Sequence, residues 1–182
     1  MFDYTQSFSN LLSHEECDSI VNLALEKKLT LGKNLSKNDN SFYDFSHRKC
    51  EVVWFYDNLP IEDIDTKLKN QSLSFVNDVI KADHNNQFIF QVARYNIGDF
   101  HNWHIDDNQD RLVGFRKFVT IVALSNPSDY DGGELEIENI PKSKMEKGQS
   151  ISFLTIRRHR VLPITKGTRY SLVVWLFGPP WR

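Results

Sequence analysis

The sequence has no apolar run that approaches the roughly 18 residues of a membrane-spanning helix. Its first residues, MFDYTQSFSNLLSHEEC, lack the basic segment followed by an apolar segment that marks a secretory signal peptide. Its two cysteines, Cys17 and Cys50, form no CxxC pair, which argues against a disulfide framework and a structural zinc site. We therefore expect a cytoplasmic protein with reduced cysteines and no membrane partner.

Neither sign of charge dominates, because 22 Lys and Arg residues stand against 24 Asp and Glu residues. A formal net charge of -2 gives no general attraction to nucleic acid. The basic cluster RRHR, residues 157–160, lies between apolar segments, so we interpret its arginines as rim residues and do not expect a nucleic-acid partner. With 182 residues, 40% hydrophobic and 25% charged, the chain is predicted to form a single domain over residues 1–182.

Two segments in the first half of the chain carry the apolar period of an amphipathic helix. The first, residues 13–28, opens with the capping-box sequence SHEE, and the second covers residues 61–82. A buried strand is predicted at residues 50–56. The polar segment before it, residues 30–49, is rich in Asn, Ser and Lys. It is either a lid that closes over a substrate or a linker.

Short β-rich segments replace the helical pattern after residue 86. Because they follow one another without intervening helices, they should pair largely antiparallel and close into a sandwich or small barrel. The predicted fold is α+β and mainly β, with helical support over about residues 1–86 and a barrel over about residues 87–182. The expected strands cover residues 87–95, 100–106, 115–125, 134–138, 150–156, 159–164 and 169–177.

The segment FHNWHID, residues 100–106, contains an HxD pattern that suits a metal. If this segment is a strand, His104 and Asp106 project from one face, whereas Trp103 and Ile105 pack on the other. One imidazole and one carboxylate could then hold the same ion. The pattern also occurs by chance, so further ligands are needed.

His159 is a candidate third ligand, because it begins a later predicted strand that a barrel could bring beside the first. Two histidines and one carboxylate leave coordination positions open, as in non-haem Fe(II) oxygenases. A closed structural zinc site has four protein ligands instead, and His101 is close enough in sequence to keep that alternative open.

Arg169 begins the segment RYSLVVW, where strand alternation places Arg169 and Trp175 on the same face. A buried guanidinium is costly unless it meets an anion, and its planar fork suits a carboxylate. The partner is either an anionic ligand or a nearby acid, Glu134 or Glu136.

Three segments together resemble a known family: YNIGDFHNWHID, VTIVALSNPSDYDGGELEI and KGQSISFLTIRRHRVLPITKGTRYSLVVW. In order and spacing they are similar to the 2-oxoglutarate and Fe(II)-dependent dioxygenases, specifically the prolyl 4-hydroxylase-like branch. The resemblance covers roughly residues 88–178, and LLSHEECDSIV resembles the helix that precedes the barrel in that branch. It implies a double-stranded β-helix, or jelly roll, buttressed by N-terminal helices.

The resemblance also implies roles for individual residues. Arg169 would bind the distal carboxylate of 2-oxoglutarate, assisted by the hydroxyl of Tyr95, and Thr120 is expected to line the same pocket. Trp175 matches an aromatic position near the metal, where it contacts substrate or packs in the core. The implied Fe(II) ligands are His104, Asp106 and His159. Ascorbate would be an optional reductant.

Departures from other branches narrow the implied activity. Leu124 stands where some relatives have a second cosubstrate tyrosine, and Trp175 stands where the DNA-repair dealkylases have a second arginine. The acid at position 106 argues against the halogenating relatives. We therefore expect hydroxylation of a C–H bond, in a prolyl residue of a protein or peptide, with release of succinate and carbon dioxide. Hydroxylation of a free amino acid or other small molecule, and a sensing module without turnover, are the alternatives.

Overall fold

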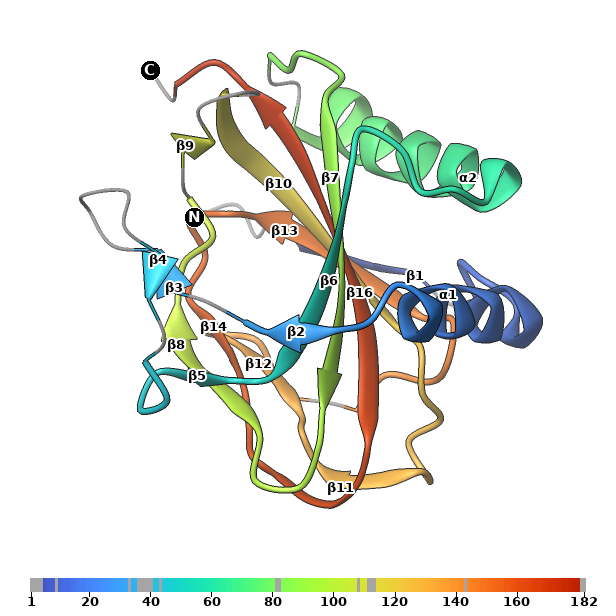
Figure 1. The fold of residues 1–182 in the computed structure, drawn as a ribbon. Coiled ribbons are helices and arrows are strands. Elements are labelled where there is room, and N and C mark those ends of the chain that lie inside the picture. The colour runs from blue at the N-terminus through green and yellow to red at the C-terminus, as the bar shows by residue number, and fades with distance from the viewer. Residues whose placement is uncertain are drawn as a thin grey trace.

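The computed structural model describes residues 5–8, 10–32, 34–35, 41–42, 44–80, 83–107, 109–110, 114–142 and 144–180 (Figure 1). In chain order the elements are β1 (Thr5–Phe8), α1 (His14–Glu26), β2 (Thr30–Leu31), β3 (Asn34–Leu35), β4 (Ser41–Phe42), β5 (Arg48–Lys49), β6 (Glu51–Tyr56), α2 (Glu62–Ser74), the π-helical segment η1 (Phe75–Ile80), β7 (Phe88–Tyr95), β8 (Phe100–His104), β9 (Gln109–Asp110), β10 (Gly114–Ala123), β11 (Tyr130–Gly132), β12 (Leu135–Ile137), β13 (Ser150–Leu154), β14 (His159–Val161), β15 (Ile164–Gly167) and β16 (Arg169–Gly178). The predicted mainly β fold with two N-terminal helices is confirmed.

Both helices begin close to where the sequence predicts. Ser13 caps α1 through a capping box, because its hydroxyl accepts from the Glu16 backbone N–H at 3.2 Å and the Glu16 carboxylate accepts from the Ser13 backbone at 2.6 Å. The second helix changes to π-helical geometry at Phe75 and continues to Ile80, and residues 81–82 of the prediction lie outside the described residues. Among the described residues, neither helix has the length and hydrophobicity that a membrane-spanning helix requires.

The larger sheet has the strand order β1-β13-β10-β16-β7-β6-β2, with β9 paired to β10, and its neighbours are all antiparallel. Both helices lie on one side of this sheet (Figure 1). A cluster of buried side chains from the helices and from β7, β10 and β16 fills the space between them. The predicted helical support is therefore anchored by burial of apolar surface.

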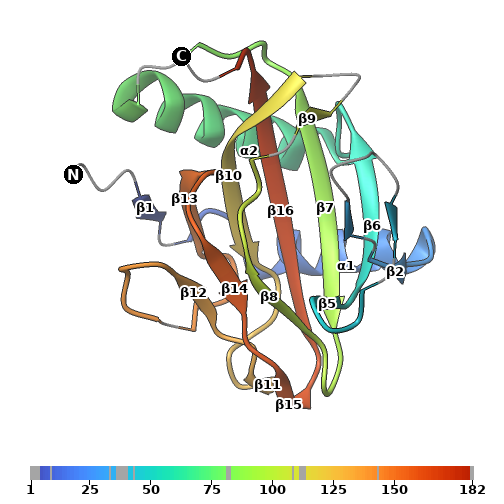
Figure 2. The ribbon, with the colours of Figure 1, turned by 90° about the vertical axis from the view of Figure 1, so that its left-hand side faces the viewer.

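A smaller sheet with the order β12-β14-β8-β5 faces the other side of the larger sheet. Figure 2 shows β8 and β14 lying in front of β16 and β7. A second cluster of buried side chains, including Ile89, Val119, Phe153, Val161 and Phe177, packs between the two sheets. Two facing antiparallel sheets of this kind form the predicted jelly roll.

The first 86 residues contribute more than the predicted helical support. Strands β1, β2 and β6 extend the larger sheet, and β5 extends the smaller one. In the polar segment at residues 30–49, β3 pairs with β4, and β5 pairs with β8. Residues 33, 36–40 and 43 of this segment lie outside the described residues, so the lid stays a prediction.

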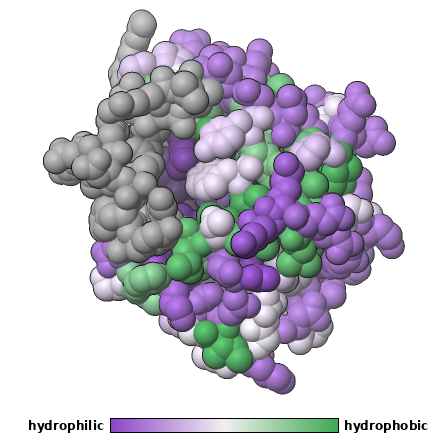
Figure 3. Space-filling model, in the orientation of Figure 1, coloured by the Kyte–Doolittle hydropathy of each residue, from purple (hydrophilic) through white to green (hydrophobic). Residues whose placement is uncertain are grey.

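The face of the molecule seen in Figure 1 mixes hydrophilic and hydrophobic side chains (Figure 3). Individual apolar residues are exposed, such as Leu25 at 46% and Leu31 at 44%. Scattered exposed apolar residues are normal on protein surfaces and point to no partner by themselves.

Candidate metal and cosubstrate site

A cavity opens between the two sheets and is lined by polar side chains as well as apolar ones. The strands that form its walls are neighbours in space, although they come from both halves of the chain. Its lining residues are Arg48, Trp54, Gln91, Tyr95, His101, His104, Asp106, Arg116, Ile121, Leu135, His159, Val161, Arg169, Ser171, Val173 and Trp175.

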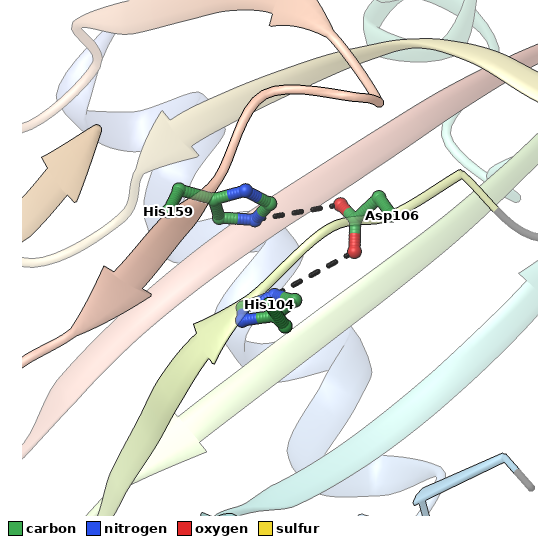
Figure 4. A group of neighbouring side chains, drawn as sticks. All are labelled: His104, Asp106 and His159. Carbon is green, nitrogen blue, oxygen red and sulfur yellow. Dashed lines mark ion pairs between the residues drawn. The ribbon is translucent and has the colours of Figure 1, made fainter. Parts of the chain in front are cut away.

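The three predicted metal ligands meet in this cavity. His104 ends β8, Asp106 follows two residues later, and His159 begins β14 directly opposite His104 in the strand register. His104 Nε2 lies 3.6 Å from Asp106 Oδ1, and His159 Nε2 lies 3.6 Å from Asp106 Oδ2 (Figure 4). One ligand atom from each side chain lies within 4.8 Å of the other two, and no other such group occurs in the described ranges.

Backbone carbonyls orient both imidazoles. His104 Nδ1 lies 2.7 Å from the carbonyl of Asn102, and His159 Nδ1 lies 3.0 Å from the carbonyl of Arg157. Because a carbonyl can only accept, Nδ1–H is the donor in each pair and the lone pair of each neutral ring stays on Nε2. Both Nε2 atoms point toward Asp106, so the second ring nitrogen fixes the tautomer that a metal requires.

The protonation states also suit a metal. Burial, with the charge of His159 as the next cause, lowers the pKa of His104 to about 3. Burial would raise the pKa of Asp106, but the charges of His159, His104 and Arg116 and the Trp175 hydrogen bond outweigh it and lower the pKa. At neutral pH the site therefore offers a neutral His104 and an ionised carboxylate, the forms that bind metals.

Asp106 is held from two sides. Its backbone N–H donates to the Thr155 carbonyl at 2.8 Å, and Trp175 Nε1 donates to its Oδ2 at 2.9 Å. The indole of Trp175 stacks on Trp54, with ring centroids 5.5 Å apart. Trp175 thus contacts a ligand of the predicted metal as well as packing in the core.

The strand predicted at residues 100–106 ends early, and this corrects one expectation. β8 stops at His104, so Ile105 leaves the sheet and is 49% exposed instead of packing beside Trp103. Trp103 lies under the guanidinium groups of Arg158 and Arg160, at 5.7 and 4.8 Å from their centres.

The arginines of the RRHR cluster are engaged within the chain. Arg160 pairs with Glu136 at 2.6 Å, and Arg158 pairs with Glu138 at 3.7 Å. Both guanidinium groups lie beside Trp103, and the interpretation of these arginines as rim residues stays a prediction.

Arg169 and Tyr95 face each other across β16 and β7 and both line the cavity. Arg169 is only 3% exposed, its Nη1 donates to Ser171 Oγ at 3.2 Å, and its guanidinium carbon lies 5.4 Å from the centre of the Tyr95 ring. In the described ranges Arg169 pairs with neither of the acids considered, Glu134 or Glu136, and Glu136 pairs with Arg160 instead. A buried guanidinium with neutral neighbours is suited to an anionic ligand.

Thr120 does not line the cavity, so the prediction that it lines the cosubstrate pocket is wrong. Its hydroxyl lies 2.7 Å from Ser152 Oγ and 3.3 Å from Ser72 Oγ of α2, on the helix side of the larger sheet. The next residue, Ile121, lines the cavity instead. Because successive strand residues face opposite ways, an error of one position in register reverses the side.

His101 lies beside the metal group but outside it. Its ring stacks on His104 with centroids 3.5 Å apart, and the three-residue group does not include it. Sequence reasoning missed Arg48, Gln91, Trp54 and Arg116, which also line the cavity. Arg48 and Trp54 belong to the first half of the chain, and only their pairing with the barrel strands reveals their position.

Comparisons with known proteins agree with this geometry. Residues 90–177 match the family model described as the 2OG-Fe(II) oxygenase superfamily. A PKHD-type hydroxylase of Synechococcus sp. (strain CC9902) is 35% identical over 88 residues, which cover 47% of this chain and 39% of that protein. The match thus spans about two fifths of the length of the curated relatives.

Solved structures extend the similarity over the whole fold. The viral collagen prolyl hydroxylase of Paramecium Bursaria Chlorella virus-1, solved as a 2OG complex, superimposes with a TM-score of 0.73 at 25% identity and covers 96% of each chain. A Pseudomonas putida prolyl-4-hydroxylase gives a TM-score of 0.69 at 17% identity, with 97% of this chain and 93% of that chain covered, and so supports the fold alone. The fold, the metal group and the family match agree, so this chain is similar to the 2OG-Fe(II) oxygenases and, among them, to the prolyl 4-hydroxylase-like branch.

Proposed function

We propose that this chain is an Fe(II)- and 2-oxoglutarate-dependent dioxygenase that hydroxylates a prolyl residue of a protein or peptide. The observation that carries the proposal is one cavity that contains both a His-Asp-His group and a buried arginine without an acidic partner among the described residues. The donor set of two imidazoles and one carboxylate is the one that non-haem Fe(II) oxygenases use.

Each lining residue has a distinct task in this proposal. His104, Asp106 and His159 would hold Fe(II) through their Nε2 and carboxylate atoms. Arg169 would bind the distal carboxylate of 2-oxoglutarate with its planar fork, and the Tyr95 hydroxyl would donate to the same group. Burial raises the pKa of Tyr95, so its hydroxyl stays protonated and able to donate.

The remaining walls would orient the reactants and exclude water. Trp54, Trp175, Val173, Leu135 and Ile121 give the cavity an apolar lining between its charged ends. When bound, Fe(II) and 2-oxoglutarate would supply the oxidising chemistry with dioxygen, yielding succinate and carbon dioxide. The protein's contribution is a fixed arrangement of metal ligands, cosubstrate anchor and substrate C–H bond.

A prolyl substrate is supported by the nature of the relatives. The similar proteins include PKHD-type hydroxylases and prolyl hydroxylases, one of them solved with a peptide fragment. A free amino acid or other small molecule remains the alternative substrate class, and a sensor without turnover remains the non-enzymatic alternative.

Succinate formation tests the proposal. Purified protein with Fe(II), ascorbate and 2-oxoglutarate is mixed with proline-containing peptides, and succinate and peptide mass are measured together. The expected result is succinate formation coupled to a gain of one oxygen on proline, absent in His104→Ala and Asp106→Ala. Coupling to a free amino acid would replace the peptide with a small-molecule substrate. Metal and 2-oxoglutarate binding without any succinate would indicate the sensor.

A further inference from the structure

Arg48 is a second buried guanidinium in the cavity. It is 8% exposed, its Nε donates to Cys50 Sγ at 3.0 Å, and its Nη2 donates to Gln91 Oε1 at 2.9 Å. Neither acceptor is an acid, and within the described ranges Arg48 forms no ion pair. Burying a guanidinium without a counter-charge costs desolvation free energy, so the position of Arg48 favours binding of an anion.

Gln91 offers an independent sign of a missing ligand. Its Oε1 accepts from Arg48, whereas its Nε2 has no hydrogen-bond partner although the side chain is only 3% exposed. Native proteins rarely leave a buried donor unpaired. Because Gln91 and Arg48 line the same cavity, one acceptor group between them would satisfy both side chains.

Because Gly32 has no side chain, the Arg48 side chain can lie against its backbone. A Cβ atom added there would lie 2.9 Å from Arg48 Nε and 3.3 Å from Cys50 Sγ. Any larger residue would therefore push the guanidinium from its place. The Arg48 head is thus seated between Gly32, Cys50 and Gln91, which is a formed site and not a flexible surface side chain.

Gln91 is separated along β7 from the predicted cosubstrate anchor, whereas Arg48 lies close enough to Tyr95 for their charges to interact. Gln91 lies opposite Val173 on β16, whereas Tyr95 lies opposite Arg169. Four residues separate Gln91 from Tyr95 along β7, which corresponds to about 13 Å at the usual strand rise. Gln91 therefore lies toward the end of the cavity where Trp175 contacts Asp106, and Arg169 lies at the other end.

The positive charge of the cavity lining is consistent with the binding of a second anion besides 2-oxoglutarate. Arg48 and Arg169 form no ion pair in the described ranges, and Asp106 is the only acid among the described residues that line the cavity. Fe(II) and the 2-oxoglutarate dianion carry equal and opposite charges, so loading both would leave the positive excess unchanged. A substrate anion would reduce it.

We propose that Arg48 and Gln91 bind a carboxylate of the substrate. The substrate class then narrows to molecules whose reacting residue lies close to a free carboxylate, either the C-terminal residue of a peptide or a free amino acid. This inference rests on the proposed function, because it assumes that the metal and cosubstrate sites are occupied as described above.

A binding experiment on the loaded protein tests the inference without turnover. The protein is first saturated with Mn(II) and N-oxalylglycine. Binding of these two ligands tests the proposed function, separately from the binding of a substrate carboxylate. Two matched probe pairs are then titrated calorimetrically: N-acetyl-L-proline against N-acetyl-L-prolinamide, and acetate against acetamide. In at least one pair the acid should bind about tenfold or more tightly than its amide, as expected for hydrogen bonds to a charged group.

Variants assign that preference to the proposed residues. Arg48→Gln and Gly32→Ala should each abolish the preference for the acid, the second by displacing the guanidinium without removing its charge. Arg158→Gln is the matched control and should retain the preference, because Arg158 lies over Trp103, pairs with Glu138 and does not line the cavity. If wild-type protein binds the acid and the amide equally tightly in both pairs, the inference is contradicted without any variant.

Two further outcomes would also overturn it. A preference for the acid that persists in Arg48→Gln would place the carboxylate elsewhere. If Arg48→Gln weakened the binding of N-oxalylglycine as strongly as Arg169→Gln does, Arg48 would belong to the cosubstrate site. If Mn(II) and N-oxalylglycine fail to bind wild-type protein at all, the proposed function falls first.

Discussion

Replacing Trp175 with phenylalanine should weaken metal binding without removing a metal ligand. The indole Nε1 donates to Asp106 Oδ2 at 2.9 Å, and this hydrogen bond limits rotation of the carboxylate. A hydrogen bond to a charged group contributes about 1.5–3 kcal/mol, which corresponds to about 10- to 150-fold in affinity. Loss of partners that orient metal ligands typically costs about 10- to 100-fold, so the two estimates agree.

The measurement is calorimetric titration of Mn(II) into metal-free protein. Trp54→Phe is the matched control, because Trp54 stacks on Trp175 with ring centroids 5.5 Å apart, whereas the indole that donates to Asp106 is that of Trp175. Trp175→Phe should lose at least tenfold in affinity, whereas Trp54→Phe should stay within about threefold of wild type. If Trp175→Phe binds Mn(II) as tightly as Trp54→Phe, the indole hydrogen bond does not orient the ligand and the reasoning fails.

Three further predictions concern the same cavity. Arg169→Ala should raise the 2-oxoglutarate concentration needed for half-maximal turnover by about 10-fold or more, and Arg169→Lys should recover part of the loss because it keeps charge but not the fork; equal requirements in all three proteins would contradict this. His104→Ala should abolish Mn(II) binding while thermal unfolding stays cooperative, because the barrel packs independently of the metal; tight binding in the variant would refute the ligand assignment. The metal-free protein should lose stability as the pH falls from 6.5 to 5, by about 1–2 kcal/mol for His104 alone, because the unfolded histidine binds a proton near pH 6.5 whereas the folded one does so only near pH 3. Denaturant titrations of His104→Gln should show a shallower pH dependence, and an unchanged slope would contradict the buried neutral state.

Local sequence signals predicted most of the elements. The capping box at Ser13 and the apolar period that follows it are properties of neighbouring residues, and so α1 begins where expected. Two of the three metal ligands could also be predicted locally, since HxD places His104 and Asp106 close together wherever the strand ends. His159 reaches them only because β14 pairs with β8, and its role was predicted from the order and spacing of the family motifs. The early end of β8 moved Ile105 into solvent but left His104 and Asp106 near each other.

Features that depend on strand register or on long-range strand pairing could not be predicted from neighbouring residues. Thr120 and Ile121 differ by one strand position, and that position decides which side of the sheet each one faces. Arg48 reaches the cavity only because β5 pairs with β8, more than 50 residues later in the chain. Its surrounding sequence, polar and rich in serine and lysine, carries no periodic signal that would indicate burial.

A crystal structure of the protein with Mn(II) and N-oxalylglycine tests the metal and cosubstrate site most directly. We expect one metal ion bound by His104 Nε2, a carboxylate oxygen of Asp106 and His159 Nε2, with the distal carboxylate of N-oxalylglycine on Arg169. A metal bound elsewhere, or N-oxalylglycine turned away from Arg169, would contradict this expectation.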